Sequence, residues 1–213
     1  MKSKFRPRMI GVIGLVAFSA AVSAAPILQP TGATSSVGFY NSSIHWSPQN
    51  TINQSGLADT YTSLVTDFDE FVPNTLTLGG SNSFNAWFAP QGVTTGTITF
   101  DLGGTFTIDG FGLWTDYQTV GQGVNDFTLF AALDDSFTSS TSLGSFNAAE
   151  GTGESENFGQ IFSYSPTEAA FVSMVITSNH GSDFTVGFSE AAFRVAGPTL
   201  RSQLFPCPLR YGC

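Results

Sequence analysis

The sequence predicts an all-β domain, an antiparallel β-sandwich, and three observations support this prediction. Apolar and polar residues alternate through most segments, as they do in strands with one buried face. Turns rich in glycine, serine and asparagine separate these segments, and no long segment has a helical period. Phenylalanine accounts for 21 of the 213 residues and only 11% of residues are charged, a composition that suits short strands better than exposed helices.

The alternation defines six segments between residues 97 and 195. In the first of them Ile98, Phe100 and Leu102 share one face, and Gly103 and Gly104 end the run. The predicted strands are, in chain order, 97–102, 108–114, 127–133, 158–164, 172–176 and 191–195. The segment 58–71 is compatible with a short helical turn, and the acidic, glycine-rich segment 148–157 is expected to be an exposed loop.

The first 24 residues have the order of a secretory signal peptide. Four cations lie within Met1–Arg8, an apolar run extends from Met9 to Phe18, and small residues lead up to Ala24. The apolar run is shorter than the roughly 20 residues that a membrane-spanning helix needs, which disfavours the alternative of a retained anchor. We therefore expect a signal peptide at 1–24, one exported β-domain at 25–196 and an irregular tail at 197–213, with the protein secreted or held at the cell surface.

Cleavage at this site has a direct test. The exported protein should begin at or near Ala25, because the small-residue site follows the apolar run directly. N-terminal sequencing of the exported pool checks this, and an intact Met1 there would contradict it.

Loss of the first 24 residues leaves a strongly acidic chain. All 16 acidic residues lie after this segment, together with only three cations, Arg194, Arg201 and Arg210, so the net charge becomes −13. Such a surface repels phosphate backbones and anionic lipid headgroups. We therefore expect neither nucleic acid nor an anionic membrane surface as a partner, whereas glycans, cations and proteins stay open.

The sequence contains no recognisable catalytic motif. His45 and His180 lie in separate turn-like segments, and neither has a cysteine, histidine or acid at metal-ligand spacing. Serine-hydrolase, zinc-protease and phosphate-loop signatures are missing. Paired carboxylates of the glycosidase kind stay open as an alternative, because the sequence does not give their separation. We therefore predict that the chain is not an enzyme.

Several stretches are informative through their order and spacing. They are 50–57 (NTINQSGL), Trp87, 96–103 (GTITFDLG), 123–129 (GVNDFTL), 171–179 (FVSMVITSN) and 186–193 (VGFSEAAF). Together they resemble the discoidin or coagulation-factor C-type domain, a galactose-binding-like jelly roll, in the version found in exported bacterial proteins of the PEP-CTERM sorting system. The resemblance implies a noncatalytic jelly roll that often carries one structural calcium and binds its ligand with loops at one end.

The resemblance also suggests where calcium would bind. Glu190 matches the family's C-terminal glutamate, which coordinates calcium near the first loop, and the Asn53 side chain and the Ser55 carbonyl are the candidate partners. The family usually has Asp-Gly where this chain has Asn53-Gln54, and a neutral amide holds calcium less strongly than a carboxylate does. The alternative is that Glu190 is a solvated glutamate at a strand end.

Two aromatic residues are candidates for contact with a sugar ring. Trp114 ends a predicted strand, and Tyr117 lies in the polar loop that follows it. The alternative for Trp114 is burial with a partner for its indole N–H. With these residues, the sequence predicts a carbohydrate-binding domain whose partner is a glycan or exopolysaccharide. The alternatives are a structural matrix or surface protein that contacts other proteins and, less favoured, a secreted glycoside hydrolase.

Overall fold

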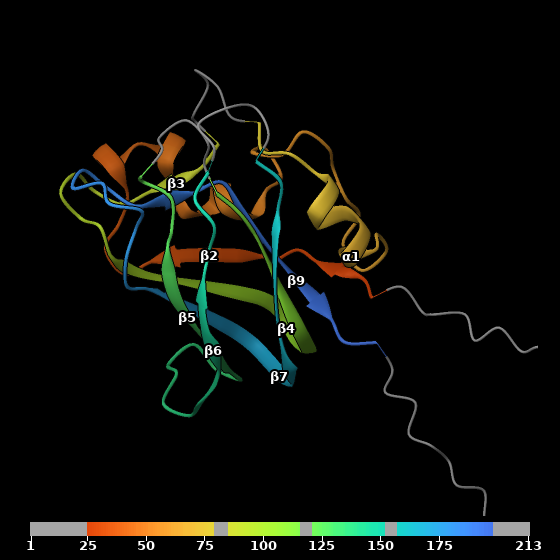
Figure 1. The fold of residues 1–213 in the computed structure, drawn as a ribbon. Helices are drawn as coiled ribbons and strands as arrows, with labels where there is room; N and C mark the ends of the chain where they lie inside the picture. Colours follow the sequence, from red (N-terminus) through yellow and green to blue (C-terminus); the bar gives the residue numbers. More distant parts are fainter. Residues whose placement is uncertain (1–24, 79–84, 116–120, 152–156, 198–213) are drawn as a thin grey trace, which may run out of the picture.

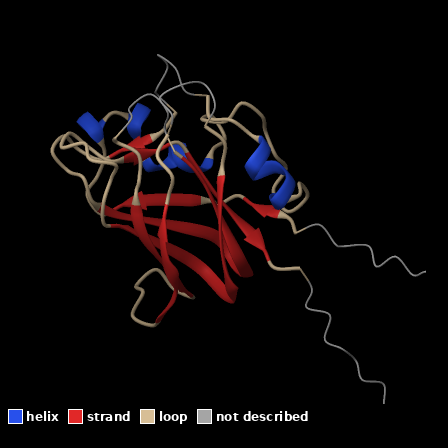
Figure 2. Ribbon diagram, viewed as in Figure 1, coloured by secondary structure: helices blue, strands red, loops and turns tan. Residues whose placement is uncertain are grey.

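The computed structural model describes residues 25–78, 85–115, 121–151 and 157–197. The predicted signal peptide, Tyr117 and the predicted tail beyond Gly197 lie outside these ranges. Strands are the main regular structure of the described chain, and its helical elements are short (Figures 1 and 2). No helix in the described ranges is long and apolar enough to cross a membrane.

The described elements follow one another in an order that begins and ends with strands. The strands are β1 (Ile27–Leu28), β2 (Gly32–Ser35), β3 (Trp87–Phe88), β4 (Gly96–Trp114), β5 (Asp126–Ala132), β6 (Ser140–Asn147), β7 (Gln160–Ile176), β8 (Gly187–Phe188) and β9 (Glu190–Val195). The helical elements are α1 (Phe68–Phe71) and the 3₁₀ turns η1 (Tyr40–Ser42), η2 (Ile44–Trp46), η3 (Pro48–Ile52) and η4 (Val72–Asn74). Figure 2 shows these helical pieces gathered at one end of the strands.

The named strands pair in antiparallel fashion throughout. The main sheet has the order β1-β9-β4-β7-β5-β6, with β2 added to β4, and β3 pairs separately with β8. The predicted strands 97–102 and 108–114 form one continuous strand, β4. Likewise, β7 contains the predicted strand 172–176 and most of the predicted strand 158–164, since it begins at Gln160. They are continuous because β4 and β7 stay paired on both sides of irregularities in their register.

The two halves of β4 belong to opposite layers of a sandwich. The first half, up to Asp101, pairs with β2 and the later part of β7, whereas the half after Ile108 pairs with β9 and the earlier part of β7. Gly103 lies at the bend with a φ of +78°, a conformation that favours glycine. Phe100 and Phe111, one from each half, have ring centroids 6.2 Å apart across the core. The predicted antiparallel β-sandwich is confirmed.

Two hydrophobic clusters fill the interior, and the smaller one supports the candidate site. The larger lies between the layers and is rich in phenylalanine. The smaller lies beside α1, and its buried members are Ile27, Leu57, Tyr61, Phe68, Val72, Trp114 and Ala192. The predicted helical turn within 58–71 is therefore α1, which buries Phe68 and presents its acidic residues outward.

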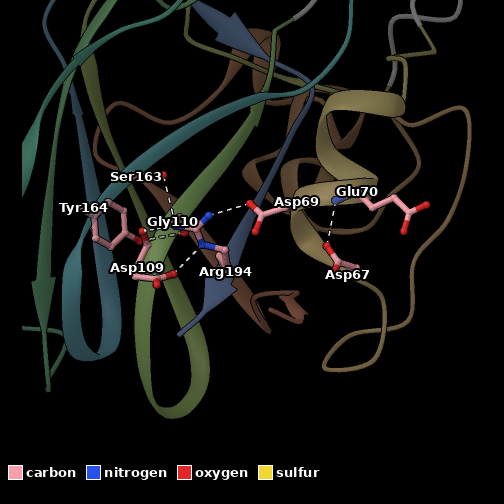
Figure 3. A network of polar contacts seen from close by, with 8 residues as sticks. All are labelled: Asp67, Asp69, Glu70, Asp109, Gly110, Ser163, Tyr164 and Arg194. Carbon is pink, nitrogen blue, oxygen red and sulfur yellow. Dashed lines mark hydrogen bonds and ion pairs between the residues drawn. The ribbon is translucent and has the colours of Figure 1, made fainter. Parts of the chain in front are cut away.

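Arg194 fixes α1 against the strands (Figure 3). Its Nε and one terminal nitrogen donate to the carboxylates of Asp109 on β4 and Asp69 on α1, both at 2.7 Å. The guanidinium carbon also lies 5.8 Å from the centroid of the Phe68 ring, close enough for a cation–π contact. Since the guanidinium of this β9 residue binds carboxylates from both α1 and β4, it holds α1 against the two strands.

Candidate functional site

A pocket lies beside α1 among the described residues. Its volume is about 370 Å³, within the range of roughly 300–1,000 Å³ that is typical of small-molecule sites. It is lined by Asp59, Thr60, Thr66, Asp67, Glu70, Phe71, Asn74 and Thr75. The lining thus combines three carboxylates, an amide and three hydroxyls with one aromatic ring.

Local hydrogen bonds shape the wall of this pocket. A carboxylate oxygen of Asp67 accepts the backbone N–H of Glu70 at 3.0 Å and caps the first turn of α1 (Figure 3). The Asn74 amide donates to the Glu70 carbonyl at 2.7 Å and closes the following turn. These bonds fix the Asp67 and Asn74 side chains to the backbone of Glu70.

Trp114 lies behind the pocket and not at its surface. It is 0% exposed, its indole N–H donates to the Thr75 carbonyl at 2.9 Å, and its ring lies 6.3 Å from that of Phe71. Gly159 approaches the ring so closely that a Cβ there would lie 2.6 Å from it. Trp114 therefore cannot offer its face to a sugar, which corrects its assignment as a sugar-contacting residue and supports the buried alternative. It instead positions Phe71 and Thr75, which line the pocket.

Tyr117, the other predicted sugar-contacting residue, lies outside the described ranges. A different group of aromatic residues lies on η1, η2 and the loop before β8. The Tyr40 ring is 6.2 Å from that of Trp46 and 5.8 Å from that of Phe184, and Phe184 is 37% exposed. We call Tyr40, Trp46 and Phe184 the aromatic group, which is a second surface to compare with the pocket in binding experiments.

Glu190, the central residue of the predicted calcium site, is fully buried. It begins β9 opposite Trp114 on β4, and one of its oxygens, Oε2, accepts the backbone N–H of Gln54 at 3.0 Å. Its other oxygen, Oε1, is buried without a hydrogen-bond partner among the described residues. Burial raises the pKa of Glu190 well above its usual range, and the bond from Gln54 offsets only part of this effect. The alternative of a solvated glutamate is therefore wrong.

The first loop lies beside Glu190, as the resemblance implies. However, two of the predicted ligand atoms already accept hydrogen bonds from other residues. Asn53 Oδ1 accepts both the backbone N–H of Ser55, at 2.9 Å, and its hydroxyl. The Ser55 carbonyl accepts the Asn85 amide at 2.8 Å. The described residues also contain no group of three or more histidine, cysteine or acidic side chains placed to hold a metal.

Of the three predicted ligand atoms, the Glu190 carboxylate is thus the one that still has an oxygen without a hydrogen-bond donor among the described residues. A buried carboxylate oxygen without a donor carries a large desolvation cost, which a cation relieves. The nearby Tyr61 hydroxyl is also buried and has no hydrogen-bond partner in the described part of the chain. Burial together with the charge of Glu190 raises the pKa of Tyr61. Calcium bound there would take Glu190 Oε1 as a ligand, and its charge would offset that of the buried carboxylate.

The pocket residues were not identified in the sequence. The acidic residues of 58–71 show no helical period, because α1 is a single short turn and the remainder of the segment is irregular. The available signal was the density of acidic residues around Phe71, including Asp59, Asp67 and Glu70. That signal does not reveal a cavity, since the cavity forms only when the segment folds over Trp114.

Comparisons with known proteins support the fold. No protein-family model matches the sequence, and no curated protein matches it. The CBM32 module of AlyQ, solved with 4,5-unsaturated mannuronic acid, matches with a TM-score of 0.50 and 18% identity over 80% of this chain and 98% of the module. Chitosan-binding module 1 of a chitosanase/glucanase from Paenibacillus sp. IK-5 matches with 0.50 and 14% over 78% of this chain and 95% of the module.

A lectin from an animal matches as well. The fucolectin from the serum of striped bass, Morone saxatilis, gives a TM-score of 0.54 at 10% identity over 77% of this chain and 46% of the lectin chain. The chain also spans only 33% of a longer AlyQ chain that contains an alginate lyase domain in addition to its CBM32 module. The described chain therefore has the galactose-binding-like β-sandwich fold that is found in these carbohydrate-binding modules and in this lectin.

Proposed function

We propose that this chain is a noncatalytic carbohydrate-binding domain, exported to the cell surface or the extracellular matrix, and that it binds its glycan in the pocket beside α1. The predicted signal peptide and the resemblance to exported PEP-CTERM proteins support the location. The fold supports the function, because proteins that share it are named for binding chitosan, for a complex with unsaturated mannuronic acid or as a fucolectin.

One observation carries the choice of site. The pocket places Phe71 in the same cavity as carboxylates, hydroxyls and an amide. A sugar offers hydroxyl groups, which bind such polar atoms, and a face of C–H groups, which packs on an aromatic ring. Concave sites with a few polar groups that fix the orientation of the ligand are typical of small-molecule recognition.

The aromatic ring provides the test of the site. The Phe71→Ala variant of the exported protein should bind its best glycan about tenfold or more weakly, because it loses the packing surface but keeps the polar lining. A glycan array identifies that glycan, and isothermal titration measures the affinity. The Phe184→Ala variant is the matched control, since it removes the same side chain from the aromatic group, and it should bind as the unaltered protein does.

Three other outcomes would contradict the proposal. Loss of binding in Phe184→Ala but not in Phe71→Ala would move the site to the aromatic group. Failure to bind any glycan would contradict carbohydrate recognition and favour the structural matrix protein. Shortening of the glycan during incubation would show a hydrolase and contradict the noncatalytic assignment.

A further inference from the structure

The pocket beside α1 has an uncompensated negative charge. Asp59, Asp67 and Glu70 all line it, and neither arginine nor lysine is among its lining residues. Arg194 is the one arginine or lysine in the described ranges, and its two ion pairs are with Asp69 and Asp109. This arginine is therefore already paired with carboxylates that are not part of the pocket lining.

This charge acts differently on three classes of sugar. A uronic acid brings a carboxylate into a pocket lined by three others, and the repulsion between like charges disfavours binding. A neutral sugar gains ordinary hydrogen bonds to the carboxylates. An amino sugar with a protonated amine gains charge-assisted hydrogen bonds, which are shorter and roughly twice as strong as neutral ones.

Carboxylates alone do not define a ligand site, but here they line a cavity together with Phe71 and Asn74. The ring and the amide provide the contacts that any sugar needs, and the carboxylates then decide which sugar is preferred. We propose that the pocket selects glycans with free amino groups, such as oligomers of glucosamine, over N-acetylated and uronic acid oligomers. This inference rests on the proposed function, since it names the ligand class of the same pocket.

The test compares three probes of equal length on the exported protein. They are an oligomer of glucosamine, the corresponding oligomer of N-acetylglucosamine and an oligomer of mannuronic acid, titrated at mildly acidic pH in low and high salt. The glucosamine oligomer should bind about tenfold or more tightly than the acetylated one, and salt should weaken only the former. The mannuronic acid oligomer should not bind measurably.

A pair of double variants connects this preference to the pocket. Asp59→Asn with Glu70→Gln removes two pocket charges without removing a side-chain hydrogen bond described for the protein, and it should reduce glucosamine affinity to that of the acetylated oligomer. Asp135→Asn with Glu168→Gln makes the same change in net charge at two exposed residues outside the pocket lining. This control should keep the preference.

The outcomes separate the inference from the proposed function. Equal binding of the glucosamine and N-acetylglucosamine oligomers would overturn the amino-sugar preference while supporting carbohydrate binding. Equal losses in the two double variants would show attraction to the acidic surface as a whole and would overturn selection by the pocket. If no glycan of any class binds, the proposed function fails as well.

Discussion

Calcium in excess over its dissociation constant is expected to raise the melting temperature of the chelator-treated protein by about 5–10 °C. Glu190 Oε1 is buried without a hydrogen-bond partner among the described residues, so a cation bound there would relieve its desolvation in the folded state only. A hundredfold excess over the dissociation constant stabilises the folded state by about 2.7 kcal/mol. For a chain of this size, each kcal/mol shifts the melting temperature by about 2–4 °C.

The variant Glu190→Gln should abolish this rise, because it keeps the size of the side chain but removes its charge. The control is Glu168→Gln, an exposed position on β7, which should keep the full rise. Thermal melts of the three proteins in chelator and in millimolar calcium provide the measurement. An unchanged melting temperature in the unaltered protein would show that no calcium binds, and a rise that persists in Glu190→Gln would place the ion elsewhere.

Removal of the Trp114 side chain is expected to reduce both stability and glycan binding. The Trp114→Ala variant should lose about 3–5 kcal/mol of unfolding free energy, because a large buried side chain is replaced by a cavity. Denaturant unfolding measures this loss. Glycan affinity should also fall under conditions in which the variant is folded, since Phe71 and Thr75 lose the ring and the indole donor that position them.

Trp87→Ala separates the two effects. Trp87 is also fully buried, and its indole N–H donates to the Gly38 carbonyl at 3.0 Å, but it belongs to the larger hydrophobic cluster. Its loss should cost a similar free energy and leave the glycan affinity of the folded protein unchanged. A loss of affinity in both variants would show that the pocket depends on overall stability and not on Trp114.

The sandwich was predictable because its evidence is local. Alternation places Ile98, Phe100 and Leu102 on one face of a strand whatever the remainder of the chain does, and all three are buried. The same pattern did not predict that 97–102 and 108–114 are halves of one strand. That continuity depends on pairing with β7 across the bend at Gly103, which is an interaction between distant segments.

The candidate calcium residue was predictable only in part. The resemblance placed Glu190 near the first loop, and the backbone N–H of Gln54 indeed donates to it. The sequence could not show that Asn53 and the Ser55 carbonyl are used by other donors, because the donors come from Ser55 itself and from Asn85. Whether calcium binds there stays a prediction for the melting experiment.

The sequence by itself determined the strand-forming pattern, the phenylalanine-rich core and the acidic charge of this protein, since these follow from residue type and local spacing. Only the tertiary structure decided where a ligand could be held. Trp114 ends a predicted strand at a position from which either exposure or burial was possible, and the packing of the 59–75 segment and Gly159 around it made it a buried support. The pocket forms where that segment packs over the Trp114 ring. The spacing of residues along the sequence does not predict such a contact between distant segments.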